Sequence, residues 1–221
     1  MSDQVTVSPG GVVLDADLHL PNESRGLVIF AHGSGSGRRS PRNRQVATTL
    51  HEGGFGTLLF DLLTAAEERR DIQDASLRFN ISLLTGRLTA VVDEIADRLD
   101  IPGLPIGLFG ASTGAAAVLG AAAARPEVVR SIVSRGGRPD LADDALPKVQ
   151  APTLLLVGEL DEPVIALNEQ AAAWLVVEHE ISLVPGATHL FEEPGTLEQV
   201  ARRALAWFSR TMPSINQSSL R

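Results

Sequence analysis

Short apolar runs alternate with longer helical patterns along most of the chain, and this alternation restricts the possible folds more than any other feature. Gly26–Ala31, Thr57–Phe60 and Thr153–Val157 are mainly apolar runs of strand length, which suits strands buried on both faces. Stretches with helical spacing of apolar residues separate them. Strands that alternate with helices are typical of a mostly parallel sheet covered on both faces. We therefore predict an α/β fold of this kind, with residues 1–221 forming a single domain.

The segment boundaries follow from these periodicities and from glycine and proline positions. The first two strands are expected to pair antiparallel, because Pro9, Gly10 and Gly11 supply turn residues between them. Expected strands are Val5–Val7, Val12–Leu20, Gly26–Ala31, Thr57–Phe60, Pro105–Phe109, Val128–Ser134, Thr153–Val157 and Glu180–Val184. Expected helices are Arg42–Glu52, Leu77–Leu99, Ala115–Arg125, Pro163–Leu175 and Pro194–Arg210.

Two segments lack a clear apolar pattern. Asp61–Ser76 is polar and charged, so we predict a loop, and Thr211–Arg221 has little to bury, so we predict a flexible tail. The connection between the strands beginning at Val128 and Thr153 has room for only one short polar helix. No separate lid is therefore expected, and an open, shallow site is predicted.

Composition excludes several classes of protein. The 221 residues are 44% hydrophobic and 21% charged, which excludes intrinsic disorder. A net charge of −8 argues against a generic nucleic-acid binder. The absence of cysteine excludes disulfides, thiolate zinc sites and a cysteine nucleophile. The N-terminal residues do not resemble a secretory signal, and the longest apolar run, Ala115–Ala124, is shorter than the roughly 20 residues that cross a bilayer. A cytoplasmic protein without membrane partners is expected.

The strongest chemical signal is Gly-x-Ser-x-Gly at residues 110–114, directly after a predicted strand and before a predicted helix. In that context a serine occupies a sharp turn at the carboxyl end of the sheet, and the flanking glycines avoid collisions with neighbouring backbone. The bare motif would arise by chance in roughly one such chain in eight, so the strand-turn-helix context carries the argument. The hypothesis is that Ser112 is a nucleophile. The alternative is that Ser112 only caps the following helix.

A serine nucleophile requires a histidine base and an acid that orients it, on loops after later strands. Asp161 and His189 occupy those places, after the strands expected at 153–157 and 180–184. Glu159, Glu162 and, more distantly, Asp140 compete with Asp161 for the acidic role, and Asp161 could instead cap the next helix. The remaining histidines, His19, His51 and His179, are expected to be structural or surface residues.

Acyl transfer also needs hydrogen-bond donors for the developing oxyanion. The Thr113 N–H, next to the nucleophile, is one expected donor. The glycine-rich loop at residues 31–37 is expected to supply the other from Ser34, with His32 and Gly33 beside the substrate. Such loops also bind phosphate, but the spacing fits neither a dinucleotide fingerprint nor a P-loop, because Arg38 stands where the third glycine would fall.

Together these segments resemble the α/β-hydrolase fold, and within it the dienelactone hydrolases, from Leu27 to Phe208. Dienelactone hydrolases carry a cysteine nucleophile, which this chain lacks, so the resemblance implies serine esterase chemistry without implying a lactone substrate. The matching stretches are Phe30–Gly37, Gly110–Gly114, Gly158–Asp161 and Gly186–His189.

Two groups of arginines follow the strands at the expected site, and a guanidinium there could bind a substrate carboxylate or phosphate. We predict that Arg135 makes such a contact. For most of the other arginines, the simpler interpretation is that they face water at the rim of the site. The two groups are Arg38, Arg39, Arg42 and Arg44 after the first loop, and Arg135 and Arg138 after the strand that begins at Val128.

The sequence thus predicts a hydrolase that cleaves a small ester, thioester or lactone through an acyl-enzyme, with Ser112, His189 and Asp161 as the triad. No metal or organic cofactor is required for this chemistry. A ligand-binding module on a hydrolase scaffold remains an alternative, as do a cofactor-free haloperoxidase and a peptidase with the same triad. The natural substrate and the oligomeric state stay open.

Overall fold

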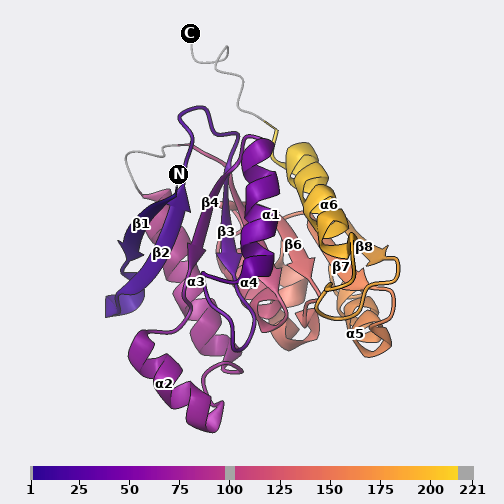
Figure 1. Ribbon diagram of the computed structural model, residues 1–221, viewed down its shortest axis with the longest axis horizontal. Helices are drawn as coiled ribbons and strands as arrows, with labels where there is room; N and C mark the ends of the chain where they lie inside the picture. The colour runs from indigo at the N-terminus through magenta and orange to yellow at the C-terminus, as the bar shows by residue number, and fades with distance from the viewer. Residues whose placement is uncertain (1, 98–102, 214–221) are drawn as a thin grey trace.

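A computed structural model describes residues 2–97 and 103–213, and in that part of the chain eight strands form one sheet in the order β1-β2-β4-β3-β5-β6-β7-β8. Strands β3 to β8 run parallel to one another, while β2 pairs antiparallel with β4 and β1 pairs antiparallel with β2 at that edge (Figure 1). The strands are β1 (Asp3–Val7), β2 (Leu14–His19), β3 (Leu27–Ala31), β4 (Gly56–Phe60), β5 (Ile106–Ala111), β6 (Val129–Arg135), β7 (Thr153–Gly158) and β8 (His179–Val184). The predicted mostly parallel α/β fold is confirmed.

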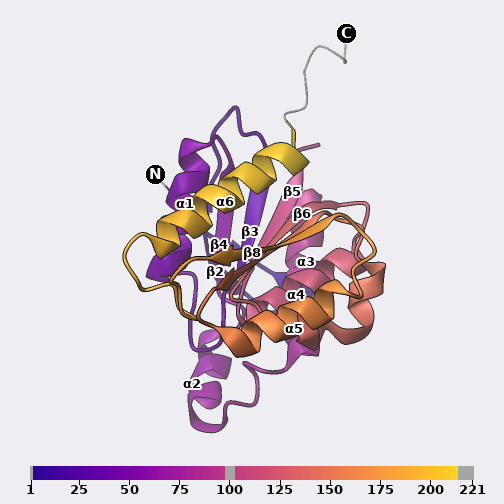
Figure 2. The ribbon, with the colours of Figure 1, turned by 90° about the vertical axis from the view of Figure 1, so that its right-hand side faces the viewer.

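Helices cover both faces of this sheet, as Figure 2 shows. On one face lie α1 (Pro41–Glu52) and α6 (Thr196–Thr211). On the other lie α3 (Ile81–Ala96), α4 (Thr113–Ala124) and α5 (Glu162–Ala172), with a 3₁₀ segment at Pro139–Lys148. A shorter 3₁₀ turn, Pro9–Gly11, connects β1 to β2 in the region predicted as a turn.

Successive strand residues enter different apolar layers because side chains alternate across a sheet. Ile29 and Leu108 pack with α3 and α4, whereas their neighbours Phe30 and Phe109 pack with α1 and α6. The helix rich in alanine and glycine, α4, approaches the sheet closely, as its composition indicates: a Cβ on Gly110 would lie 2.6 Å from the Ala115 Cα. The two layers hold the carboxyl ends of β5, β6 and β7 in fixed positions, and those ends carry the candidate site.

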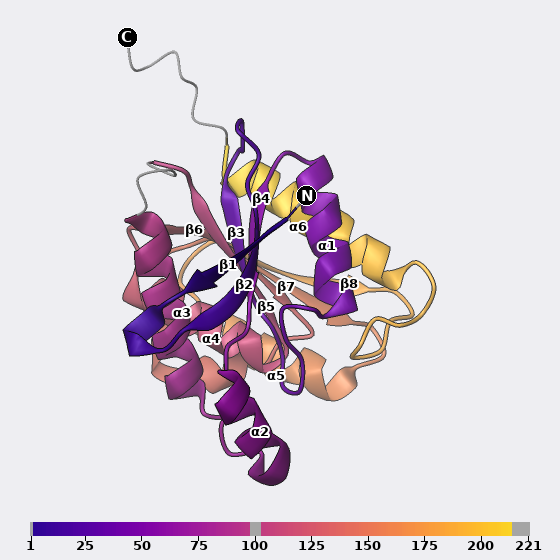
Figure 3. The ribbon, with the colours of Figure 1, turned by 60° about the vertical axis from the view of Figure 1, so that its left-hand side comes forward.

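The predicted loop at Asp61–Ser76 is wrong, because it contains helix α2 (Ala65–Asp74). This helix projects at the carboxyl end of the sheet (Figure 3). It begins with a capping box: Thr64 Oγ1 accepts from the Glu67 N–H at 3.3 Å, and Glu67 Oε2 accepts from the Thr64 N–H at 2.8 Å. Only Asp71 of α2 is buried, so the apolar periodicity that reveals a packed helix is missing.

Two further boundaries differ from expectation. The helix predicted from Leu77 begins at Ile81, because the Asn80 side chain accepts from the Leu83 N–H at 3.1 Å and caps it there. Its expected end at Leu99 lies outside the described residues. At the C-terminus, Thr211 still belongs to α6 and Met212 is buried, so the predicted flexible tail does not begin there, and residues 214–221 lie outside the described part.

Candidate functional site

Ser112 lies in the turn between β5 and α4, and its backbone adopts φ 50° and ψ −121°. A positive φ is costly for a residue with a side chain, and such strain is concentrated at functional positions. Ser112 occupies the N-cap position of α4, yet its side chain makes no capping hydrogen bond, so the simple capping explanation fails. The turn needs glycine at 114, where a Cβ would lie 2.3 Å from the carbonyl oxygen of Ala31.

His189 and Asp161 meet as the sequence predicts. The His189 Nδ1 lies 2.7 Å from the Asp161 Oδ2. Asp161 is the N-cap of α5 but makes no side-chain capping bond, and its side chain is only 12% exposed. A carboxylate at Nδ1 holds a proton on that nitrogen and leaves Nε2 with its lone pair. The pair therefore provides an imidazole in the tautomer that a base requires.

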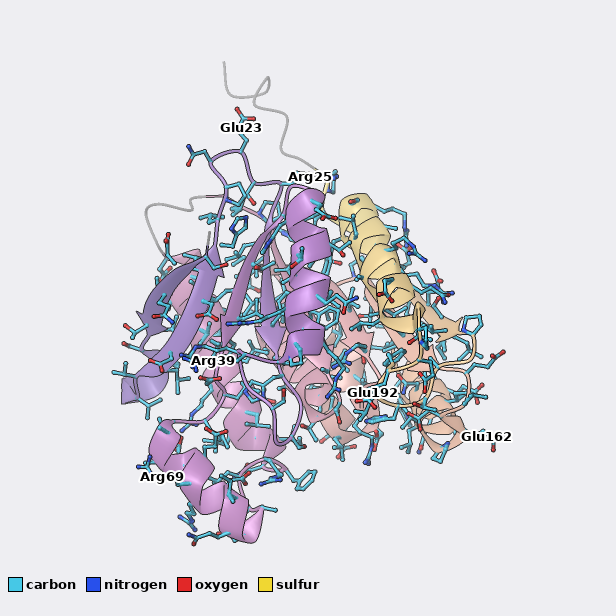
Figure 4. The ribbon with its side chains drawn as sticks, viewed as in Figure 1. Glu23, Arg25, Arg39, Arg69, Glu162 and Glu192 are labelled. Atoms are coloured by element: carbon cyan, nitrogen blue, oxygen red, sulfur yellow. The ribbon has the colours of Figure 1, made fainter. Side chains whose placement is uncertain are left out.

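The competing acids have other roles. Glu159 Oε2 accepts from the Gly186 N–H at 2.9 Å, and Asp140 pairs with Arg138 at 2.8 Å. Glu162 is exposed and lies at the outer edge of the molecule in Figure 4, away from the sheet. Of the four candidates, only Asp161 contacts His189 within the part of the chain that the structure describes.

His189 lies over the strand end next to the nucleophile. A Cβ on Gly136 would lie 3.7 Å from His189 Cε1, and the residue before it, Arg135, accepts a hydrogen bond from the Ser112 N–H at 3.2 Å. Among the described residues, the Ser112 hydroxyl makes no hydrogen bond, including to His189. Such bonds are often long without substrate and tighten in the complex. His189 thus lies over the end of β6, next to the turn that carries Ser112, and no hydrogen bond joins their side chains in the described structure.

The loop after β3 lies against the nucleophile. A Cβ on Gly33 would lie 3.0 Å from the Ser112 Cβ, and the Ser34 Oγ is 3.1 Å from the Thr113 Oγ1. Within residues 2–97 and 103–213, the N–H groups of Ser34 and Thr113 donate to no protein acceptor. Both expected oxyanion donors therefore lie beside Ser112 with their N–H groups available.

His32, expected beside the substrate, has both of its ring nitrogens bound to backbone. Its Nδ1 donates to the Gly33 carbonyl at 2.9 Å, and its Nε2 accepts from the Leu62 N–H at 2.9 Å. Burial lowers the pKa of this imidazole and keeps it neutral. Because both ring nitrogens bind backbone, His32 has no polar group left for a substrate in this arrangement. Its contacts instead fix the loop that carries Gly33 and Ser34.

The other histidines take no part in this arrangement. The rings of His19 and His51 stack with centroids 3.8 Å apart, and His51 bonds the Thr57 hydroxyl at 2.7 Å. His179 is exposed at the start of β8. These positions agree with the structural and surface roles expected for all three.

Most of the arginines near the site are neutralised by carboxylates. Arg38 pairs with Asp61, and Arg44 pairs with Asp17 at 2.9 Å. Arg42 pairs with the exposed Glu192 at 3.0 Å, on the lower side of the view in Figure 4. Arg38, Arg42, Arg44 and Arg138 therefore fit the simpler reading as paired rim residues, and Arg39 is exposed.

Arg135 is different, because its guanidinium is buried without a counter-ion. Its side chain lies on the α1 and α6 face in line with Val133, and the residue is 8% exposed. The guanidinium carbon lies 5.8 Å from the centre of the Phe191 ring, and the Nε has no hydrogen-bond partner in the described structure. Burial, with the nearby Arg42, lowers the pKa of Arg135 to about 10. Burying a cation in this way costs desolvation free energy unless an anion pairs with it.

A cavity that the sequence did not predict lies under α2, beside the loop after β3. This loop, at residues 32–37, is called the oxyanion loop below. The volume of the cavity is about 160 Å³. A larger cavity of about 430 Å³ lies near Pro105 and Met212, at the amino ends of the strands, away from the candidate site. The Thr64-x-x-Glu67 capping box could have revealed the helix that covers the smaller cavity. That cavity is lined by residues of the loop after β3, the segment after β4, α2, and the starts of α3 and α4.

Two further properties of the described residues concern metal ions and membranes. None of the His, Asp and Glu side chains in this part of the chain gather in a group of three or more that could hold a metal ion. No helix in the same ranges is long and apolar enough to cross a membrane.

Comparisons with known proteins agree with this architecture. The crystal structure of a dienelactone hydrolase from Anabaena variabilis is 52% identical and superimposes with a TM-score of 0.94, over 96% of this chain and 98% of that one. Est1E from Butyrivibrio proteoclasticus shares the fold at 18% identity, with a TM-score of 0.77 over 94% of this chain and 98% of its own.

A curated relative from Mycobacterium tuberculosis, named "Putative phosphoribosyl transferase", is 54% identical over 207 residues. These residues are 93% of this chain but only 46% of the relative, so the chain spans about half the length of that protein. The model of the dienelactone hydrolase family matches residues 14–218. With a match over nearly its whole length, the chain belongs to the dienelactone hydrolase family and is an α/β hydrolase.

Proposed function

We propose that this hydrolase cleaves carboxylic esters with Ser112 as nucleophile, His189 as general base and Asp161 as the residue that orients it. The observation that carries the proposal is the 2.7 Å contact between His189 and Asp161, on loops beside a serine that adopts a strained turn and caps nothing. This arrangement has the parts that acyl transfer through a serine requires.

The reaction follows from the protonation states. His189 Nε2 takes the Ser112 hydroxyl proton as the Oγ attacks the ester carbon, and the carbonyl oxygen becomes an oxyanion between the N–H groups of Ser34 and Thr113. The intermediate collapses as the bond to the leaving alcohol breaks, and His189 gives its proton to that oxygen. Water then repeats the sequence on the acyl-enzyme, which releases the acid and restores Ser112.

The transferase name of the mycobacterial relative describes a protein about twice as long as this chain. The matched half is the part with a hydrolase fold, so that name does not alter the proposed chemistry. Fold alone does not decide function, and a binding module without catalysis remains the alternative to test.

A fluorophosphonate probe tests the proposal directly. We expect the probe to modify the protein once, at Ser112, because only a serine activated by a base attacks it readily. Intact-mass measurement followed by peptide mapping locates the modification. A protein that stays unmodified, or that is modified at another residue, is a binding module or uses other chemistry.

We further propose that Arg135 binds an anionic group on the leaving alcohol. Phe191, which contacts the guanidinium, is two residues from His189, and His189 protonates the leaving oxygen. An anion there would supply the counter-ion that the described residues do not give to Arg135. Arg42 is close enough for its charge to act on Arg135, although Glu192 partly balances that charge.

Two esters that differ in the charge of the leaving group distinguish the Arg135 contact from a general difference in reactivity. We expect 4-carboxyphenyl acetate to exceed neutral 4-carbamoylphenyl acetate in kcat/KM by about 10- to 100-fold, the range for hydrogen bonds to charged groups. Arg135→Met should abolish the preference and leave the Tm equal or higher, because the change removes an unpaired buried charge. Arg44→Met serves as the control, since Arg44 is exposed and paired with Asp17. A preference that persists in Arg135→Met would rule out this contact.

A further inference from the structure

The cavity under α2 lies beside the turn that carries Ser112. It contacts the oxyanion loop through Ser34 and the nucleophile turn through Thr113. The residues that line it come from positions 32–36, 61–84 and 113, and none comes from β6, β7, β8 or the His189 loop. The cavity is therefore adjacent to the oxyanion donors and separate from the base.

This placement determines which half of an ester can enter it. His189 must reach the leaving oxygen to protonate it, so the leaving group lies on the His189 side. The carbonyl oxygen points to Ser34 and Thr113. The acyl chain is then directed to the remaining side, where the cavity lies.

The lining favours an uncharged chain. Leu62, Leu63, Ile72 and Leu84 provide apolar walls. The guanidinium of Arg78 pairs with Asp71, with the Nε to Oδ2 distance at 2.6 Å, so the positive charge of Arg78 is balanced by that carboxylate. Glu68 adds negative charge, which would repel an acyl group carrying a carboxylate, while the charge of Asp61 is balanced by Arg38.

The wall formed by α2 is fixed in place by ion pairs. Arg87 on α3 is 8% exposed, and its Nη1 donates to Glu67 Oε2 at 2.7 Å and to the Leu62 carbonyl at 2.8 Å. The hydrogen bonds from Arg87 lower the pKa of Glu67 to about 2. Arg78 fastens the other end of α2 through Asp71. The cavity is thus formed before a substrate binds.

We infer that this cavity is the acyl subsite and that it selects apolar acyl groups of about four to six carbons, an inference that rests on the proposed serine-hydrolase function. The volume of about 160 Å³ sets the size, since an apolar cavity of about 150 Å³ in another protein accommodates benzene. Longer chains would extend past Ile72, which is 72% exposed at the margin.

The test uses p-nitrophenyl esters, which share one leaving group and differ only in acyl length from acetate to dodecanoate. We expect kcat/KM to rise about threefold to fourfold per methylene, to a maximum at about four to six carbons, and then to fall. Ile72→Asp should lower the ratio of kcat/KM for the hexanoate to kcat/KM for the acetate about tenfold. Phe79→Asp is the matched control, because Phe79 is an exposed apolar residue nearby that does not line the cavity.

The outcomes separate the two proposals. A flat profile, a maximum beyond eight carbons, or equal effects of both aspartate substitutions would overturn the acyl subsite, while fluorophosphonate labelling of Ser112 would still support the hydrolase. A protein that hydrolyses no ester of the series and leaves Ser112 unlabelled would overturn both.

Discussion

Replacement of Ser112 by alanine is expected to lower kcat for ester hydrolysis by about 10⁶-fold, the loss found when the nucleophile of a well-studied serine hydrolase is removed. The substitution removes the oxygen that forms the acyl-enzyme, and the nearby hydroxyls of Ser34 and Thr113 are hydrogen-bonded to each other. Because the Ser112 side chain makes no capping hydrogen bond, its removal should leave the Tm nearly unchanged. Initial rates with p-nitrophenyl butyrate and thermal unfolding measure the two quantities.

Ser209→Ala is a suitable control for this experiment. Ser209 is a partly buried residue of α6 whose Oγ is 3.2 Å from Arg25 Nη1, and Arg25 lies at the end of the molecule opposite α2 (Figure 4). We expect its activity to match that of the unmodified protein. If Ser112→Ala retained most of its activity while folded, attack by Ser112 would be excluded.

The second large effect is expected for Asp161→Asn, which should reduce kcat by about 10⁴-fold with little change in KM. An asparagine keeps the size of the side chain but can donate a hydrogen bond to Nδ1, which favours the tautomer with the proton on Nε2. The imidazole would then have no lone pair for the Ser112 proton. The pH profile of kcat, compared between the variant and the unmodified protein, shows whether the base has been altered.

Glu159→Gln and Glu162→Gln test the alternative acids. Glu159 bonds the Gly186 N–H and Glu162 is exposed, so each substitution should change kcat by no more than about threefold. A loss of activity in either glutamine variant, together with an active Asp161→Asn, would assign the acid to another residue.

The sheet could be predicted because strands buried on both faces need continuous apolar runs, and Gly26–Ala31 and Thr153–Val157 are such runs. The turn at Ser112 was also predictable, since a strand, Gly-x-Ser-x-Gly and a helix follow one another directly. Helix α2 was not predictable from apolar spacing. Capping and ion pairs stabilise it, and because most of its side chains are exposed, its sequence shows no apolar periodicity. The capping box of α2 was a local signal for a helix. The polar and charged composition of the segment nevertheless favoured the prediction of a loop.

Which partners the charged and titratable groups at the site have could be learned only from the three-dimensional structure. A sequence shows that Arg135 follows a strand, but the absence of a counter-ion depends on which distant carboxylates the fold brings near. The same holds for His32, whose ring bonds Leu62 across 30 positions of sequence. Which of Glu159, Asp161 and Glu162 meets His189 likewise depends on the path of a short loop that periodicity does not describe.

Helix α2 contributes no residue to either apolar layer, and its attachments come from a few polar side chains. The segment that shapes the acyl cavity is therefore nearly independent of the segments that carry Ser112, Asp161 and His189. Substitutions in this helix can therefore alter substrate choice without disturbing the reacting groups. Substrate recognition and catalysis would then be adjustable separately.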